Sequence, residues 1–164
     1  MKLNELIEKY GEYEVKEGFM DLLEKPKPKS VWDLKNGDVY YFLTSYGYVM
    51  KTVWVDTDAD NEKLSIGNAF LTEEDAEFAR EHLKVITELK KYAKEFSDED
   101  WAQNNCVQKY YIYYNWSNGE VFANYDYYTS YGNQLLFESG EKTQKAIDAV
   151  GEERIKKYYF GVKG

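Results

Sequence analysis

The sequence predicts an α+β protein: two related ββ(β)α units with antiparallel strands and packed helices, preceded by a short helical N-terminal arm. Two observations lead to this fold class. The same order of aromatic strand, glycine turn and capped helix occurs twice, and a proline-containing segment separates these repeats from an amphipathic N-terminus. We assign residues 1–30 to the arm and its Pro/Lys linker, 31–100 to the first unit with its long acidic helix, and 101–164 to the second, Tyr-rich unit. We expect the two units to share one core.

The arm is predicted from apolar residues that recur at helical spacing and end at Gly11. A second short helix is expected over residues 19–23. Residues 24–30 hold both prolines of the chain, which disfavour helix and indicate an extended linker. Two roles stay open for the arm: it packs on the body or on a second copy of the chain, or it binds a separate partner. The apolar positions of its first helix are Leu3, Leu6, Ile7 and Tyr10.

The first unit is expected to begin with a β-hairpin. Aromatic and β-branched residues fill 39–43 and 49–55, and such residues suit half-buried strands. Gly47 lies between the two runs and marks the turn. A further short strand is expected near Phe70, ahead of the helix.

The second unit repeats this order. Strands are predicted at 109–114 and 121–125, and the Asn118-Gly119 pair between them is a strong hairpin signal because glycine accepts a positive φ. A short strand is again expected near Phe137, which opens a pattern of Phe, Ser/Thr, Glu and Ala positions that also opens at Phe70.

Each unit then continues into a helix. Thr72 and Ser139 are the expected N-caps, because a hydroxyl at that position accepts a bond from a free backbone N–H group. The first helix is expected to run on its apolar spacing to Phe96, and Ser97–Asp100 is a second cap signal that starts a short helix. Residues 158–162 close the chain either as a last strand or as packing against the body.

Charge and composition limit the class of protein. The hydrophobic fraction of 43% is enough for a folded core, and 21 basic against 30 acidic residues give a net charge of −9. Such acidity disfavours direct nucleic-acid binding, because phosphates require a basic surface. One cysteine excludes an internal disulfide and fits a reducing cytoplasm, and no apolar run or signal peptide indicates a membrane. We therefore expect a cytoplasmic protein.

The carboxylates of residues 56–62 alternate as in the opening of a calcium loop. An EF-hand requires glycine at loop position six and glutamate at position twelve, where this chain has Asn61 and Gly67. We expect a solvated acidic hairpin loop and assign no metal ligand. Cys106 is expected to be a packing residue and His82 a surface or core-edge histidine. The chain lacks phosphate-loop, dinucleotide and nucleophile-elbow motifs, so we assign no catalytic residue and no cofactor and predict a non-enzyme.

Two groups of side chains are candidates for partner binding. Regularly spaced carboxylates can imitate a phosphate backbone and steer the protein to a basic channel of a partner. Tyrosine and tryptophan are enriched at protein-binding hot spots. Each group also has a structural interpretation, as a solvated face and as half-buried strand residues. The candidate partner-binding residues are Asp56, Asp58, Asp60, Glu62, Glu73, Glu74, Glu77, Glu81, Tyr111, Tyr113, Trp116, Tyr125, Tyr127 and Tyr128.

Three segments carry a resemblance to a known group of proteins: PKPKSVWDLKNGDVYY at 26–41, GNAFLTEEDAE at 67–77 and QKAIDAVGEERIKKYYFG at 144–161. They are similar to small uncharacterised accessory proteins encoded by phages and prophages of low-GC Gram-positive bacteria. The resemblance covers most of residues 26–161 and transfers no catalytic residue. It implies a phage context, in which small acidic proteins often bind and block a host or defence protein.

The leading hypothesis is a non-enzymatic phage-type binding protein that inhibits a host defence system, for example CRISPR or restriction, through its acidic and Tyr-rich surface. One alternative is a binder or sponge of a small nucleotide-like signal molecule in a Tyr-lined groove between the units. The other is single-strand nucleic-acid binding through the Tyr-rich sheet. A homodimer formed through an exposed sheet edge also stays open.

Overall fold

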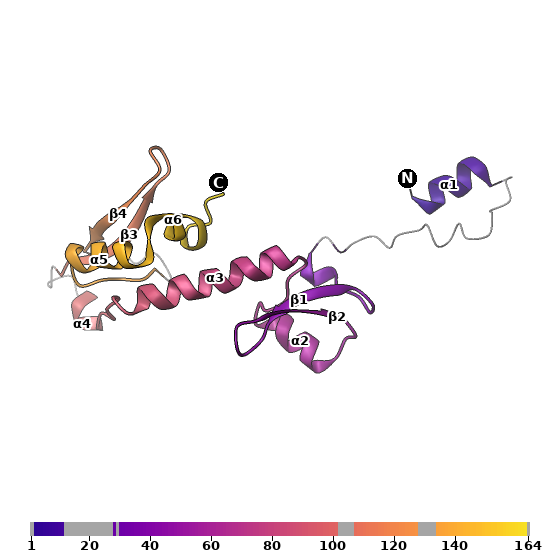
Figure 1. Cartoon of the computed structure of the whole chain (residues 1–164), viewed down its shortest axis with the longest axis horizontal. Helices are drawn as coiled ribbons and strands as arrows, with labels where there is room; N and C mark the ends of the chain where they lie inside the picture. The colour runs from indigo at the N-terminus through magenta and orange to yellow at the C-terminus, as the bar shows by residue number, and fades with distance from the viewer. Residues whose placement is uncertain (1, 12–27, 29, 102–106, 128–133, 164) are drawn as a thin grey trace.

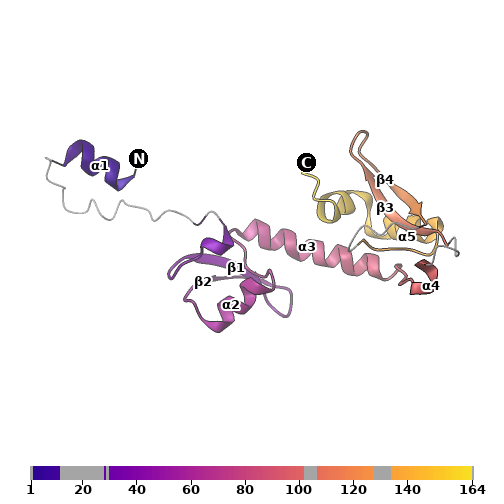
Figure 2. The ribbon, with the colours of Figure 1, turned by 180° about the vertical axis from the view of Figure 1, so that it is seen from behind.

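The chain folds as an α+β protein with two small antiparallel sheets of two strands each, which confirms the predicted fold class at this level. Figure 1 shows the computed structural model, and Figure 2 shows it from behind. The structure describes residues 2–11, 28, 30–101, 107–127 and 134–163. Among these residues, no helix has both the length and the apolar character needed to cross a membrane.

The first sheet pairs β1 (Val39–Leu43) with β2 (Val49–Val53), and Val39 lies opposite Val53. Gly47 takes a φ of +78° in the turn between them, a conformation that glycine adopts without steric cost. The predicted strand near Phe70 is a single bridge between that residue and Tyr41. A 3-10 turn, η2 (Val31–Asp33), precedes the hairpin, and the helix α2 (Asp58–Ser65) follows it.

The longest helix, α3 (Glu73–Lys90), runs between the two sheets in both views (Figures 1 and 2). It begins at the predicted cap, where the Thr72 hydroxyl accepts a bond from the N–H of Asp75 at 3.1 Å. It ends before Phe96, the predicted end, because the main chain leaves the helical path after Lys91. The short helix α4 (Asp98–Trp101) starts at the second cap signal, as expected.

The second sheet pairs β3 (Lys109–Asn115) with β4 (Glu120–Asp126). Gly119 takes a φ of +75° in the predicted turn, and Tyr110 forms a single bridge with Phe137. The helix α5 (Gly140–Val150) begins at its predicted cap, Ser139. It is followed by the short helix α6 (Glu152–Arg154) and by η3 (Ile155–Tyr159), a π-helical turn.

The structure corrects two expectations and decides between the two alternatives for a third segment. Residues 58–65 form helix α2 and not an acidic hairpin loop, because Thr57 and Asp60 cap its first turn reciprocally. Of the two alternatives for residues 158–162, packing against the body is the one observed: the segment contains no strand, and the chain packs against α3 through η3. Most buried apolar side chains of the described residues form two clusters and not one, because Val31, Leu34 and Leu64 close the core beneath the first hairpin, whereas the C-terminal half of α3 packs with β3, α5 and η3.

The two clusters differ in size. The first centres on Tyr40, Trp54 and Ala69, and partly buried side chains of η2 and α2 pack against it. The second joins the C-terminal half of α3 to β3, α5 and η3. Its buried members are Val85, Leu89, Ile112, Phe137, Ala146, Ile147, Val150 and Ile155.

Helix α1 (Leu3–Tyr10) lies where the apolar spacing predicts a helix. The expected second helix at 19–23 lies outside the described residues, as do most of the Pro/Lys linker, Cys106 and Tyr128.

Candidate functional site

An open cleft of about 550 Å³ lies between the N-terminal half of α3 and the turn η3. It contains all four helix carboxylates that the sequence proposed as partner-binding residues, and it adds two aromatic rings and a lysine. The cleft is lined by Glu73, Glu74, Glu77, Phe78, Glu81, Lys157 and Tyr158. We call it the acidic cleft.

Glu73 and Glu74 supply the uncompensated charge of the acidic cleft. Both side chains are exposed, and neither forms an ion pair with any residue that the structure describes. They lie in the first turn of α3, where negative charge is stabilised by the helix dipole. Their position therefore has a structural benefit as well as a capacity to attract cations.

Glu77 and Glu81 differ, because cations of the same helix already compensate them. Glu77 pairs with Arg80, and Glu81 accepts bonds from Lys84 at 2.7 Å and from Arg80 at 3.4 Å. The hydrogen bond from Lys84 is the main reason that the pKa of Glu81 lies below its ordinary value. These two carboxylates are partly buried and contribute less free charge than Glu73 and Glu74.

Phe78 and Tyr158 form the aromatic wall of the acidic cleft. Their ring centroids lie 5.4 Å apart with the planes tilted by 50°, and Phe78 keeps 39% of its surface exposed. The ammonium group of Lys157 lies 5.0 Å from the centroid of the Tyr158 ring. That distance is within the range of a cation–π interaction.

Two contacts between α3 and the C-terminal turns hold this wall in place. The Nδ1 atom of His82 lies 2.5 Å from the carbonyl oxygen of Tyr158. The Arg154 guanidinium donates two bonds to the Glu88 carboxylate, at 2.9 and 3.0 Å, which lowers the pKa of that carboxyl group. His82 is half-buried in the helix–turn contact, as a core-edge histidine would be.

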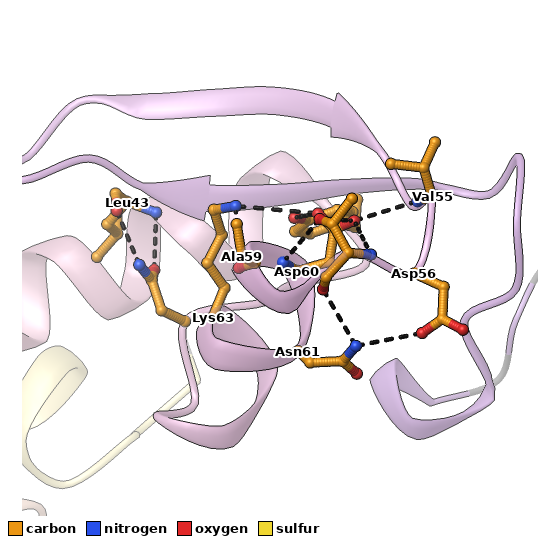
Figure 3. Close-up of polar contacts among 10 residues, drawn as sticks. Leu43, Val55, Asp56, Ala59, Asp60, Asn61 and Lys63 are labelled. Atoms are coloured by element: carbon orange, nitrogen blue, oxygen red, sulfur yellow. Dashed lines mark hydrogen bonds and ion pairs between the residues drawn. The ribbon is translucent and has the colours of Figure 1, made fainter.

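The structure places Asp60 in a buried network instead of on a binding surface (Figure 3). Asp60 is 5% exposed, and its carboxylate accepts a bond from the Tyr40 hydroxyl at 2.6 Å. The N–H groups of Val55 and Thr57 and the Thr57 hydroxyl also donate to it. These bonds, led by that of Tyr40, lower its pKa to about 2. Asp60 is therefore a structural residue that is not accessible to a partner.

The other carboxylates of this segment lie at the surface of the first unit. Asp56, Asp58 and Glu62 are exposed and do not line the acidic cleft. Asp56 takes a φ of +58°, and its carboxylate accepts a bond from the Asn61 amide at 3.2 Å (Figure 3). In the part of the chain that is described, no group of three or more His, Cys, Asp or Glu side chains is arranged to hold a metal ion.

The aromatic residues of the second hairpin differ in exposure. Tyr111 is buried, with 8% of its surface exposed, so it does not lie on the proposed binding surface. Tyr113 and Trp116 are 41% and 70% exposed. The ring of Tyr113 packs against the exposed ring of Phe122 on the neighbouring strand, with the two ring centroids 5.2 Å apart. Tyr125 is exposed at 46%. Its ring packs against Tyr127, which is half-buried.

Lys109, the one cation in the sequence of β3, is buried at 1% exposure. Its ammonium group donates to the carbonyl oxygens of Asp100, Val107 and Tyr127 at 2.6, 3.0 and 3.0 Å. The ring of Trp101 lies 4.4 Å from the same ammonium group. Because the charge is enclosed, it is not presented to a nucleic-acid strand at the outer face of the sheet.

A second groove, of about 690 Å³, lies between the β1–β2 turn and the middle of α3. Tyr46 and Tyr48 line it from the turn, with 85% and 67% of their surfaces exposed, and Leu83 lines it from the helix. The groove is bounded by elements of the first unit, whereas the sequence proposed a Tyr-lined groove between the units.

The chain matches no protein-family model, no curated protein and no solved structure.

Sequence reasoning missed Phe78, Lys157 and Tyr158 as members of the cleft. Phe78 and Tyr158 belong to apolar stripes that predict core packing, and nothing in the sequence indicates that these two stripes meet. The one local signal was the position of Phe78 between Glu77 and Glu81, on a helix face that is otherwise acidic.

Proposed function

We propose that the protein is a non-enzymatic binding protein that attaches to a basic surface of a partner protein through the acidic cleft. One observation carries the proposal: the unpaired carboxylates of Glu73 and Glu74 lie beside the exposed ring of Phe78 in a single concave site. Unpaired charge steers a basic partner toward the site, and an exposed aromatic side chain is a typical energetic anchor of an interface.

The resemblance to phage and prophage accessory proteins suggests the identity of the partner. We propose a host or defence-system protein in the bacterial cytoplasm whose nucleic-acid channel is basic, such as a component of a CRISPR or restriction complex. A carboxylate-lined helix would compete there with the phosphate backbone. Inhibition then requires occupancy of the channel and no catalytic group.

We further infer that residues 31–100 and 101–164 are two copies of one ββ(β)α unit that follow a helical arm. Three parallels support this inference. Each hairpin has a positive-φ glycine in its turn, each first strand bridges to a phenylalanine (Phe70 or Phe137), and each following helix begins at a hydroxyl cap two residues later. Only the second unit is continued by the turn η3, which completes the acidic cleft.

The test is a double charge reversal at the two unpaired carboxylates. Tagged wild-type protein is used to capture a partner from a nuclease-treated Gram-positive host lysate, and the affinity for that purified partner is then measured by calorimetry. We expect Glu73→Lys with Glu74→Lys to weaken binding at least tenfold and to abolish inhibition of the partner.

The matched control reverses two exposed acids away from the cleft, Glu120→Lys with Asp148→Lys. It changes the net charge equally and should retain binding within about twofold. Equal affinities of the two double variants would contradict the proposal, since binding would then depend on net charge alone. Circular dichroism of both variants checks that the fold is retained.

The groove lined by Tyr46 and Tyr48 favours a second candidate, the binding of a small nucleotide-like molecule by ring stacking. Its test is a screen of cyclic and linear nucleotides for a rise in melting temperature. A rise that Tyr46→Ala and Tyr48→Ala both remove would support this function. No rise with any nucleotide would exclude it.

A further inference from the structure

Lys157 extends from η3 into the acidic cleft, and its ammonium group lies over the ring of Tyr158 at 5.0 Å. The side chain is exposed, and no carboxylate among the described residues lies within ion-pair distance of its nitrogen. The Lys157 ammonium therefore contacts the Tyr158 ring and forms no ion pair with a described residue. The chain itself thus places a positive group against the aromatic wall.

We infer that the ligand of the acidic cleft is an arginine side chain of the partner, and that this guanidinium displaces the Lys157 ammonium from the ring of Tyr158. The inference rests on the proposed function and names the group that the same site recognises. Lys157 is then an internal competitor that occupies the cation position while the partner is absent.

Arginine fits the site better than lysine for geometric reasons. A guanidinium is planar and can stack on the ring of Tyr158, in the position that the Lys157 ammonium leaves, while its N–H groups bond to a carboxylate in two-point fashion. An ammonium is a compact, strongly hydrated charge. The exposed carboxylates of Glu73 and Glu74 have no ion-pair partner among the described residues and are free to accept these bonds. The cleft volume of about 550 Å³ accommodates a long side chain with its apolar stem against the rings.

The displacement has a measurable consequence. A cation–π contact at an exposed site is weak, so removal of the Lys157 ammonium should tighten arginine binding by about two- to fivefold. Removal of the Phe78 ring should weaken it by a similar factor, because Phe78 packs against Tyr158 and completes the apolar wall of the cleft.

The experiment titrates the ¹⁵N-labelled full chain with the probe acetyl-Gly-Arg-Gly-amide and follows amide shifts by NMR. We expect saturable shifts confined to α3 residues 73–82 and to η3. The corresponding peptide with norleucine should give none, and the lysine peptide should bind more weakly. Lys157→Met should lower the half-saturating concentration about two- to fivefold, and Phe78→Ala should raise it.

The matched control is Lys145→Met, which removes one exposed cation from α5 and changes the net charge equally. The inference is overturned if Lys145→Met tightens binding as much as Lys157→Met, or if the arginine peptide causes no shifts in the cleft. Phe78 is partly exposed, and the NMR spectrum of Phe78→Ala reports directly whether the variant folds.

The experiments distinguish failure of this inference from failure of the proposed function. Retained partner binding by Glu73→Lys with Glu74→Lys removes the proposed function whatever the peptide does. Lost partner binding in that variant, combined with no effect of Lys157→Met on the arginine peptide, keeps the proposed function and removes only the role of Lys157.

Discussion

The Tyr40 hydroxyl donates a hydrogen bond of 2.6 Å to the Asp60 carboxylate, and both side chains are buried beneath the first hairpin. The bond connects β1 to the first turn of α2. Burial, together with the bond to the carboxylate, raises the pKa of Tyr40 above its ordinary value. The ionised carboxylate and the neutral phenol are thus each the favoured form.

Tyr40→Phe should lower the free energy of unfolding at pH 7 by about 1–3 kcal/mol, because a buried carboxylate oxygen loses its donor. Urea denaturation measures this loss. The control is Tyr48→Phe, which removes a hydroxyl from a side chain that is 67% exposed and should change stability by less than about 0.5 kcal/mol. Equal stability of the two variants would contradict the assigned role of the buried bond.

The same carboxylate makes stability depend on pH. The folded-state pKa of Asp60, about 2, lies below its ordinary value of 3.8, so its contribution is present above pH 3.8 and is lost as the pH falls through about 2. The contribution is about 2 kcal/mol. We expect the stability gap between Asp60→Asn and the wild type to narrow between pH 5 and pH 2. A gap that stays constant over this range would show that the Asp60 pKa is not lowered.

Lys109→Met should destabilise the second unit by about 3 kcal/mol or more, because three main-chain carbonyl groups lose a charged donor. The control, Lys51→Met, removes an exposed ammonium from β2 and should have little effect. Hydrogen exchange of the β3 amides offers a second readout, and we expect faster exchange in Lys109→Met alone. Unchanged unfolding and unchanged exchange would refute the structural role of this lysine.

Asn68→Ala should lower stability by about 1–2 kcal/mol, because its amide both accepts from the Leu43 N–H and donates to the Leu43 carbonyl, each at 2.8 Å. These two bonds close the end of β1 against the segment that leads to α3. Asn61→Ala removes an exposed amide and should cost less. Urea denaturation measures both losses. The prediction is contradicted if Asn61→Ala lowers the free energy of unfolding more than Asn68→Ala does.

The pair of Arg154 and Glu88 should show a coupling energy of about 1 kcal/mol in a double-mutant cycle with Arg154→Met and Glu88→Gln. The value is modest because the two side chains are 38% and 34% exposed, so solvent screens their attraction. We expect the coupling to fall further in 1 M salt. A coupling that is insensitive to salt would indicate packing and not charge as its origin.

Local signals predicted the parts of the fold that depend on local chemistry. Thr72 and Ser139 were predicted as caps because a hydroxyl before a helix has a specific hydrogen-bonding role, and Gly47 and Gly119 were placed in turns because they tolerate positive φ. These features need no knowledge of distant residues.

Helix α2 was missed because its sequence, DADNEKLS, has little apolar periodicity. The helix contacts the hairpin through the hydrogen bond between Asp60 and Tyr40 and through the apolar side chain of Leu64. Both contacts depend on the hairpin that the helix covers. A helix stabilised by a buried hydrogen-bond network has no hydrophobic pattern for sequence reasoning to detect.

The candidate site was predicted in part. The spacing of the four α3 carboxylates led to their proposal as binding residues, and all four line the acidic cleft. Tyr111 and Asp60 were proposed as well, and both are buried. The aromatic wall joins Phe78 to Tyr158 through a π-helical turn, and such a turn has no sequence signature. Pairs so distant in sequence meet only through packing that one sequence does not reveal.

Helix α3 contains neither glycine nor proline between Glu73 and Lys90, and its eighteen residues span about 27 Å. Such a helix has no built-in hinge. It therefore connects its two ends without a flexible joint: Phe78 lies at the acidic cleft, and Leu89 is buried in the larger cluster. A partner bound at the acidic cleft would consequently contact the same uninterrupted helix whose other end packs in the larger cluster.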